Sequence, residues 1–229
     1  MEFLFSAATQ PSLPVEGTSA LFPVRRIFCV GRNYAAHAAE MGGEVDREAP
    51  WYFNKSAHTV CLSGATIPMP PETENCHYEM EFTVALDGEA KAISEAEAIG
   101  AVFGYASGID LTRRDLQAIA KEMRRPWDLG KDFENAAILG AITPVAAFGA
   151  PKDQRIWLDH NGERVQEARL SDMVWNVAEI IAHLSRFYHL MPGDLIMTGT
   201  PAGVGPVAPG SHLQGSIEGL APVELRFSN

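Results

Sequence analysis

Two glutamates alternate with apolar residues in the segment HYEMEFTVAL, residues 77–86. This period of two predicts a strand with one apolar face, and it places Glu79 and Glu81 together on the other face, roughly 6–7 Å apart. A second predicted strand, residues 101–109, would deliver Asp110 at its end. Three buried carboxylates require a cation, and oxygen ligands favour Mg²⁺, Mn²⁺ or Ca²⁺ over zinc or copper. The alternative interpretation is an amphipathic strand with its acidic face in water and Asp110 as a turn former.

A histidine and a glutamate follow a predicted strand near the start of the chain. Asn33 is expected to cap a short helix that runs through Glu40 and stops at Gly42 and Gly43. His37 then lies on the same helix face as Glu40, three residues away. Such a pair could take a proton from water, with the glutamate orienting the imidazole or sharing its role. The same spacing is also typical of a solvated helix face.

Cationic and hydroxyl side chains supply candidates for anion binding. Arg114 and Lys131 could bind a substrate carboxylate, although isolated cations are usually surface charges. Thr200, within TGTPAGVG, offers a hydroxyl beside backbone N–H groups, with a structural turn as the alternative. The glycine spacing there matches neither a phosphate-binding loop nor a dinucleotide fingerprint.

The elements that must position these residues are mostly strands. Helices are predicted after Thr112, which would act as a cap, and over residues 172–190, capped by Ser171. Residues 138–148 are a further strand candidate, broken at Pro144, and residues 195–197 precede a loop rich in glycine and proline. The pattern predicts a mainly β, α+β chain, a mixed sandwich or rolled barrel with a few peripheral helices.

Length and composition restrict the class of protein. We expect residues 1–229 to form a single catalytic domain, with residues 1–22 as an N-terminal arm or hairpin. The formal charge of −11 disfavours nucleic acid and anionic membranes as partners. No run of 18 apolar residues exists, and Glu2 stands where a signal peptide would carry basic residues, so we expect a cytoplasmic protein. The three cysteines lack CxxC spacing and should be reduced and buried.

Five blocks in order give a more specific signal than any single motif. They are CVGRNYAAHAAEM, HYEMEF, GIDLTRRDLQ, RPWDLGKDF and PGDLIMTGTPAGVGPVAPG. From about Arg25 to Arg226 the chain resembles the fumarylacetoacetate hydrolase family, and most closely its bacterial fumarylpyruvate hydrolase and acylpyruvase group. The resemblance implies a mixed β-strand roll, usually assembled as a homodimer.

The resemblance also implies roles for the residues singled out above. Glu79, Glu81 and Asp110 would hold one Mg²⁺ or Mn²⁺, with Ca²⁺ as an ion that could replace it in crystals. His37 and Glu40 would form the catalytic dyad. The residues that contact substrate would be Arg114, Gln117, Lys131 and Thr200, and Lys131 would also stabilise the enolate formed in the reaction.

The implied reaction is hydrolysis of a carbon–carbon bond in a 2,4-dioxo acid, fumarylpyruvate giving fumarate and pyruvate in aromatic compound degradation. Enolate stabilisation also permits oxaloacetate decarboxylation or tautomerisation, and 2-hydroxymuconate-type isomerisation or decarboxylation. A non-catalytic, metal-stabilised binding module is a further alternative. Two departures from the family pattern are Lys55-Ser56 and residues 134–137. A fumaryl carboxylate would need another cation, for which Arg32 and Lys55 are the candidates.

Overall fold

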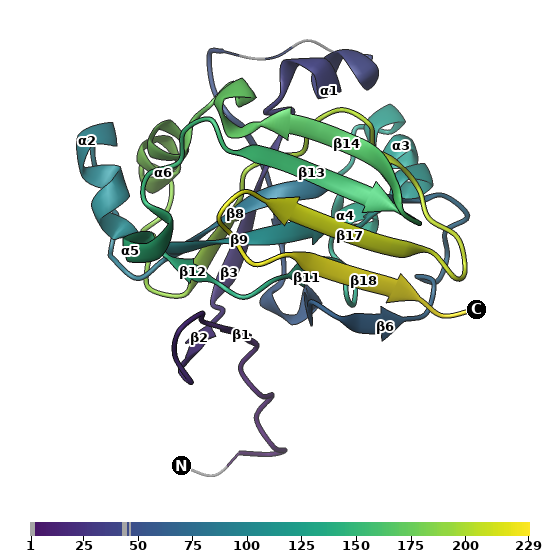
Figure 1. Cartoon of the computed structure of the whole chain (residues 1–229), viewed down its shortest axis with the longest axis horizontal. Helices are drawn as coiled ribbons and strands as arrows, with labels where there is room; N and C mark the ends of the chain where they lie inside the picture. Colours follow the sequence, from purple (N-terminus) through teal and green to yellow (C-terminus); the bar gives the residue numbers. More distant parts are fainter. Residues whose placement is uncertain (1–2, 43–44, 46) are drawn as a thin grey trace.

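Two curled β-sheets face each other (Figure 1). Buried apolar side chains from both sheets form the main core. The computed structural model describes residues 3–42, 45 and 47–229. The strands are β1 (Ser12–Pro14), β2 (Leu21–Pro23), β3 (Arg26–Gly31), β4 (Trp51–Lys55), β5 (Val60–Leu62), β6 (Ala65–Ile67), β7 (Cys76–Tyr78), β8 (Met80–Leu86), β9 (Val102–Asp110), β10 (Thr112–Arg113), β11 (Ala137–Leu139), β12 (Thr143–Pro144), β13 (Arg155–His160), β14 (Glu163–Arg169), β15 (Asp194–Met197), β16 (Gly205–Pro206), β17 (His212–Ile217) and β18 (Val223–Phe227).

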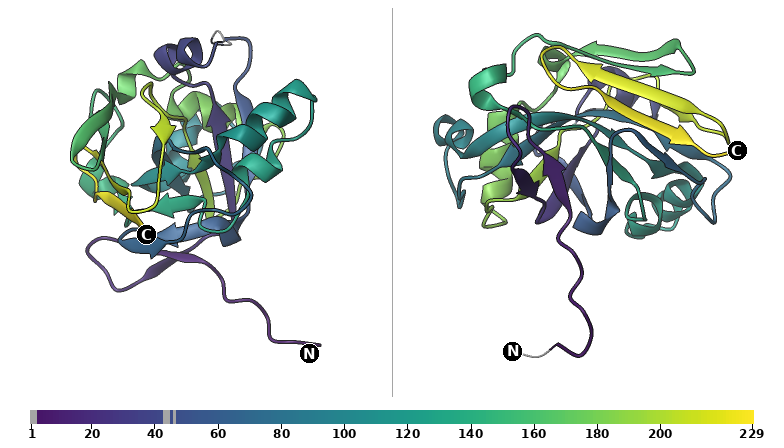
Figure 2. Two further views of the ribbon diagram at one scale, coloured as in Figure 1. Left: turned by 90° about the vertical axis from the view of Figure 1, so that its right-hand side faces the viewer. Right: turned by 60° about the horizontal axis from the view of Figure 1, so that its bottom comes forward.

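Helices are short and lie around the sheets (Figure 2). The α-helices are α1 (Ala35–Glu40), α2 (Glu95–Ala98), α3 (Arg114–Glu122), α4 (Asp128–Lys131), α5 (Val145–Phe148) and α6 (Val177–Ser185), and the 3₁₀ turns are η1 (Ala57–Thr59), η2 (Ile99–Ala101) and η3 (Leu170–Asp172). None of the helices in the described part of the chain has the length and hydropathy needed to cross a membrane. The predicted fold class, mainly β with peripheral helices, is confirmed.

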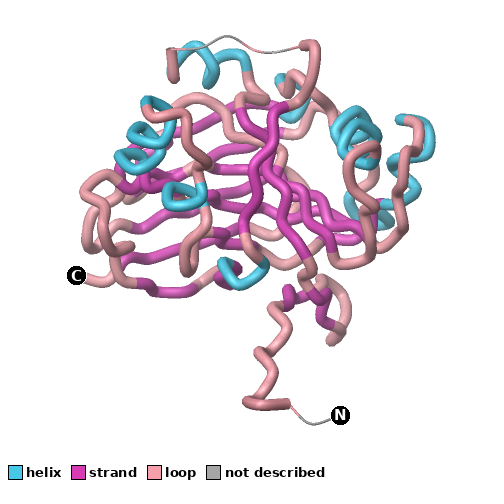
Figure 3. The backbone as a smooth tube through the Cα atoms, turned by 180° about the vertical axis from the view of Figure 1, so that it is seen from behind, coloured by secondary structure: helices cyan, strands magenta, loops and turns pink. Residues whose placement is uncertain are grey.

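The larger sheet has the strand order β4-β3-β15-β8-β9-β11-β5, with β12 also paired to β9. It lies behind the second sheet in Figure 1 and therefore faces the viewer in Figure 3. The second sheet has the order β14-β13-β17-β18-β6. Apolar residues of both sheets, among them Phe82 and Leu158, pack together in the main core. A second apolar cluster joins Leu13 and Phe22 of the β1–β2 hairpin to the larger sheet. Each layer thus has an apolar face to bury, which is the physical basis of the sandwich.

The segment predicted as one strand over residues 77–86 divides at Glu79. β7 pairs with β10 and β16 in a small sheet, whereas β8 pairs with β9 and β15 in the larger sheet. The predicted apolar face of this segment lies in the main core. The acidic face is also buried, contrary to the water-facing alternative.

Several predicted helix starts and ends are wrong because tertiary contacts replace the expected caps. Tyr34, not Asn33, precedes α1, which is followed by Met41; Gly43 lies outside the described residues. Arg113 rather than Thr112 precedes α3. The helix predicted over residues 172–190 is limited to α6, which Asn176 caps through a hydrogen bond from the N–H of Glu179.

Strand prediction also failed in places. Residues 138–148 contain the end of β11 and then β12, which ends at Pro144 where the break was predicted, but the residues after Pro144 form the helix α5 instead of a strand. The strands β13, β14, β17 and β18 were missed altogether. In β14 only Gln166 is buried, so the strand carries no clear alternation of apolar residues. The three cysteines are buried and unpaired, as predicted.

Candidate active site

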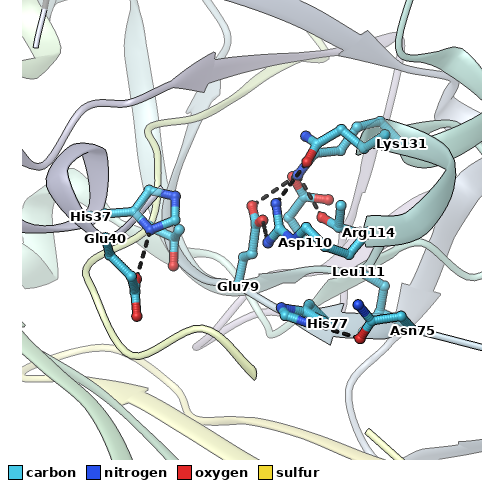
Figure 4. A network of polar contacts seen from close by, with 12 residues as sticks. His37, Glu40, Asn75, His77, Glu79, Asp110, Leu111, Arg114 and Lys131 are labelled. Atoms are coloured by element: carbon cyan, nitrogen blue, oxygen red, sulfur yellow. Dashed lines mark hydrogen bonds and ion pairs between the residues drawn. The ribbon is translucent and has the colours of Figure 1, made fainter. Parts of the chain in front are cut away.

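Three carboxylates lie close together where two neighbouring strands meet. Two of them, Glu79 and Asp110, are labelled in Figure 4. Glu79 lies between β7 and β8, Glu81 is in β8, and Asp110 ends β9. The antiparallel pairing of β8 with β9 continues through a 2.8 Å hydrogen bond from the Asp110 N–H to the Glu79 carbonyl. One ligand oxygen from each residue lies within 4.8 Å of the other two, and all three residues are buried. The predicted metal ligands are therefore adjacent in space.

Three cations neutralise two of these carboxylates. The Lys131 ammonium donates to Glu79 at 2.8 Å, to Asp110 at 2.7 Å and to Thr112 Oγ1 at 2.6 Å. Arg114 forms an ion pair with the other oxygen of Glu79. Although burial alone would raise the pKa of Glu79, Lys131 and Arg114 outweigh that effect and hold the pKa well below its usual range.

Lys55 is the third cation, and it is buried next to Asp110 without lining the cavity. Its Nζ is 2.8 Å from Asp110 Oδ1, without hydrogen-bonding geometry, and it donates to the carbonyls of Leu111 and Lys131. Because its side chain is fully buried against Asp110, the expectation that Lys55 reaches the distal end of a substrate is wrong.

Glu81 differs from the other two carboxylates. Its Oε2 accepts a 2.8 Å hydrogen bond from the Gly199 N–H, and within residues 3–42, 45 and 47–229 no cation forms an ion pair with it. Burial, followed by the nearby charges of Asp110 and Glu79, raises the pKa of Glu81 well above its usual range. A carboxylate without a cation, converging with two others, makes an all-oxygen site that suits a hard divalent ion.

The predicted dyad lies on α1, across from Glu79 (Figure 4). His37 Nδ1 is 3.2 Å from Glu40 Oε2, and the Gly203 N–H donates to both Glu40 oxygens at 3.1 and 3.2 Å. His37 is buried in the cavity wall, whereas Glu40 is not among the residues that line the cavity. If Nδ1 donates its proton to Glu40, Nε2 keeps the lone pair that a general base needs.

The predicted substrate-contacting residues surround the same cavity. Its lining includes His37, Glu79, Glu81, Arg114, Gln117, Lys131 and Thr200. Arg114 and Gln117 come from the first turn of α3, where Arg114 Nη1 donates to Gln117 Oε1 at 2.7 Å. Gly130 of α4 permits this packing, since a Cβ there would come within 3.0 Å of Gln117. The structure thus places all of these candidates in one cavity wall, with Asp110 and Glu40 outside that lining.

The loop after β15 connects the carboxylates with the dyad. Gly199 has φ of +98°, and a Cβ there would lie 2.8 Å from the Cβ of Asn33. Both features require glycine. The N–H of Gly199 is thereby directed at Glu81, and the N–H of Gly203 at Glu40.

Gly199→Ala is expected to destabilise the protein by about 1–3 kcal/mol, because a left-handed backbone and a close contact are both penalised. It should also weaken divalent-metal affinity by about tenfold, since Glu81 loses its aligned partner. Gly64→Ala is the matched control, because Gly64 has φ of +88° but open space around it. Thermal unfolding and metal titration measure the two effects. Equal metal affinities for the two variants would contradict the role given to Gly199.

Gln166 of β14 is a site residue that the sequence analysis missed. Its Nε2 donates to Thr200 Oγ1 at 2.9 Å and to the Pro201 carbonyl at 2.8 Å, and its Oε1 accepts from the Met80 N–H at 2.9 Å. A single amide from the second sheet therefore holds both the Thr200 loop and the start of β8. Because Thr200 Oγ1 accepts this hydrogen bond, its own proton remains available to donate.

We expect Gln166→Leu to raise the KM for an anionic substrate by about tenfold, with a smaller change in kcat, because Thr200 loses its orientation. Steady-state kinetics at a temperature where the variant is fully folded provides the measurement. Thr200→Val should give the same KM change, and the double variant should add little to it. Additive KM changes would show that Gln166 acts independently of Thr200, and would contradict this role.

Two more residues near the site have a role that the sequence did not predict. Asn33, predicted as a helix cap, instead donates to the carbonyls of Trp175 and Thr198 and accepts from the Trp175 N–H. Thr112, also predicted as a cap, accepts from Lys131. In both cases a side chain able to cap a helix is used for a long-range contact, which local sequence cannot reveal.

Comparison with known proteins gives a consistent result. Residues 26–228 match the fumarylacetoacetate (FAA) hydrolase C-terminal family. The chain is 46% identical over 187 residues to a fumarylpyruvate hydrolase of a Ralstonia species, covering 81% of this chain and 97% of that one. It is 39% identical over 203 residues to a mitochondrial oxaloacetate tautomerase of Oryza sativa, covering 87% and 88%.

A solved structure agrees over the whole chain. The fumarylpyruvate hydrolase of Pseudomonas aeruginosa, crystallised with Mn²⁺ and pyruvate, superposes with a TM-score of 0.95 at 43% identity, covering 99% of each chain. The match spans the elements that carry the carboxylates, the dyad and the Thr200 loop. This chain is a member of the fumarylacetoacetate hydrolase family.

Proposed function

We propose that this protein is a metal-dependent hydrolase that cleaves fumarylpyruvate, an acylpyruvate, into fumarate and pyruvate. The observation that carries the proposal is that His37, Glu79 and Glu81 line one cavity, with Asp110 beside the two glutamates and Glu40 within hydrogen-bonding distance of His37. The 46% identity to a fumarylpyruvate hydrolase supports the choice of substrate. The likeness to a structure crystallised with Mn²⁺ and pyruvate supports both the metal and the product.

We propose Glu79, Glu81 and Asp110 as the ligands of one Mg²⁺ or Mn²⁺. The all-oxygen donor set and the absence of a cation partner for Glu81 among the described residues fit such an ion. When bound, the ion would act as a Lewis acid that stabilises negative charge on the 2-oxo acid part of the substrate.

The side chains of this protein would share the remaining work. His37 Nε2 takes a proton from water, and Glu40 stabilises the imidazolium through Nδ1. The water oxygen attacks the acyl carbonyl distal to the pyruvoyl carboxylate, the carbon–carbon bond breaks, and pyruvate leaves as its enolate, which then accepts a proton. Arg114, Gln117 and Thr200 orient the carboxylate end of the substrate, while Lys131 stabilises the enolate.

A tautomerase or decarboxylase acting on oxaloacetate is the second candidate, because the chain is 39% identical to an oxaloacetate tautomerase. A 2-hydroxymuconate-type isomerase or decarboxylase would use the same enolate stabilisation. The dyad favours hydrolysis, because breaking the bond with water needs a base positioned to activate that water.

An ultraviolet assay with Mg²⁺ or Mn²⁺ tests the choice between these functions. Fumarylpyruvate, maleylpyruvate, acetylpyruvate and oxaloacetate would be compared, with pyruvate release measured separately. We expect the highest kcat/KM for fumarylpyruvate. A kcat/KM for oxaloacetate well above that of every acylpyruvate would replace the hydrolase by the second candidate.

The assembly and location stay predictions that follow from the family resemblance and composition. We propose a homodimer in which each chain is a single catalytic domain with an N-terminal arm, located in the cytoplasm. Light scattering after size exclusion measures the dimer directly.

A further inference from the structure

Three cationic side chains near the cavity already form ion pairs with carboxylates of the protein. Lys55, Lys131 and Arg114 form ion pairs with Glu79 and Asp110. These three cations are therefore already paired with carboxylates of the protein. A cation of the cavity that lacks such a pair can bind an anionic ligand instead.

Arg32 and Lys121 also line this cavity, yet neither forms an ion pair with a carboxylate in the part of the chain that the structure describes. We propose that Arg32 and Lys121 form a second anion subsite, which binds the distal carboxylate of the acyl group and selects dicarboxylate acylpyruvates. This inference rests on the proposed function and extends it to the specificity of the same site.

The position of Lys121 follows from the geometry of α3. Arg114, Gln117 and Lys121 are spaced i, i+3 and i+7, so they share one face of the helix, and all three line the cavity. Seven residues of helix rise about 10 Å. This separation is comparable with the length of an extended seven-carbon diacid, so one carboxylate at Arg114 would place the other near Lys121.

The surroundings of Lys121 favour an anion. Its Nζ lies 5.0 Å from the centre of the Trp127 ring, which also lines the cavity. Burial lowers the pKa of Lys121, and the positive charges of Arg114 and Arg32 lower it further. A carboxylate bound between these cations would relieve their repulsion.

Arg32 approaches from another element. It follows β3 directly and has φ of +56°, a left-handed conformation that is uncommon for a residue with a side chain. The next residue, Asn33, fixes this turn through its hydrogen bonds to Trp175 and Thr198. Arg32 is thus an exposed residue that lines the cavity, has no ion pair among the described residues, and has a strained backbone of the kind that occurs at functional sites.

The proposed subsite should distinguish ligands that have a distal carboxylate from ligands that lack one. Fumarylpyruvate carries a carboxylate at the end of its acyl group, whereas acetylpyruvate carries a methyl group there. Fumarate and crotonate differ in the same way, since crotonate has a methyl in place of one carboxylate. The subsite should therefore bind fumarate better than crotonate, and this comparison needs no turnover.

The experiment uses Arg32→Asn, because asparagine tolerates the left-handed backbone, and Lys121→Met, which keeps the length of the side chain. Each is expected to lower kcat/KM for fumarylpyruvate by roughly 10- to 100-fold, the loss typical of a charged hydrogen bond. The value for acetylpyruvate should change by less than about threefold. Lys152→Met, an exposed lysine outside this cavity, is the matched control.

Calorimetric or tryptophan-fluorescence titration with fumarate and crotonate gives the second readout. We expect the preference for fumarate in the wild type to disappear in both variants and to remain in Lys152→Met. Equal losses for both acylpyruvates, or an unchanged fumarate preference, would overturn the subsite. If the wild type hydrolyses neither acylpyruvate, the proposed function fails, while the fumarate titration still decides the subsite.

Discussion

Glu81→Gln and Asp110→Asn are each expected to abolish turnover and to weaken Mn²⁺ binding by more than about 100-fold. Partners that only orient metal ligands already contribute about 10- to 100-fold to affinity, so loss of a ligand charge should exceed that range. Both substitutions keep the size of the side chain. Calorimetric titration with Mn²⁺ and steady-state kinetics measure the two effects. Wild-type turnover together with wild-type metal affinity in either variant would remove these residues from the site.

The two variants should behave differently when metal is removed with a chelator. Asp110 lies between Lys55 and Lys131, so Asp110→Asn leaves buried ammonium groups uncompensated and should destabilise the protein by about 3–5 kcal/mol. Glu81 lies near two other carboxylates and accepts a hydrogen bond from the Gly199 N–H. Glu81→Gln keeps an oxygen acceptor and removes a repulsive charge, so the metal-free variant should unfold at or above the wild-type temperature. Only the wild type should then gain Tm when Mn²⁺ is added.

His37→Ala is expected to lower kcat by about 10²- to 10⁴-fold with little change in KM, because a general base acts on the chemical step rather than on binding. Glu40→Gln should have a smaller effect, since the amide oxygen would still accept from Gly203 but would no longer carry the charge that stabilises the imidazolium. His212→Gln, at a 2.7 Å hydrogen bond with Glu224 in the second sheet, is the matched control.

The outcome of His37→Ala also separates the alternative roles of the dyad. A large rise in KM with an unchanged kcat would reassign His37 to substrate positioning. Mn²⁺ affinity should stay at the wild-type value, because His37 is not part of the carboxylate cluster. A combined loss of metal affinity and turnover would show that the substitution disturbs the carboxylates instead.

Much of the candidate site is readable from the sequence because its signals are local. The period of two around Glu79 and Glu81 and the strand that ends at Asp110 are patterns of neighbouring residues. The antiparallel pairing of β8 with β9 then brings the three carboxylates together. The same holds for His37 and Glu40, whose contact needs only one turn of helix.

The tertiary structure decided which side chains surround that site. Lys55 and Gln166 come from strands far away in the sequence, and each is buried because a distant partner compensates it: Asp110 for Lys55, and Thr200 with Met80 for Gln166. A lone lysine or glutamine in a sequence usually indicates an exposed side chain. The local pattern therefore predicts exposure for both residues, although both are buried.

Contacts between distant segments also determine where helices begin and end. The sequence determined that apolar residues recur with helical spacing over residues 172–190, but the helix begins only at Val177. Before it, the backbone N–H groups of Val174 and Trp175 bond to Asn33, far away in the chain. Residue types and apolar faces are thus properties of the sequence by itself. Whether a side chain caps a nearby helix or forms a hydrogen bond with a distant segment depends on the folded chain. Only folding brings the distant segment close enough to compete with the local partner.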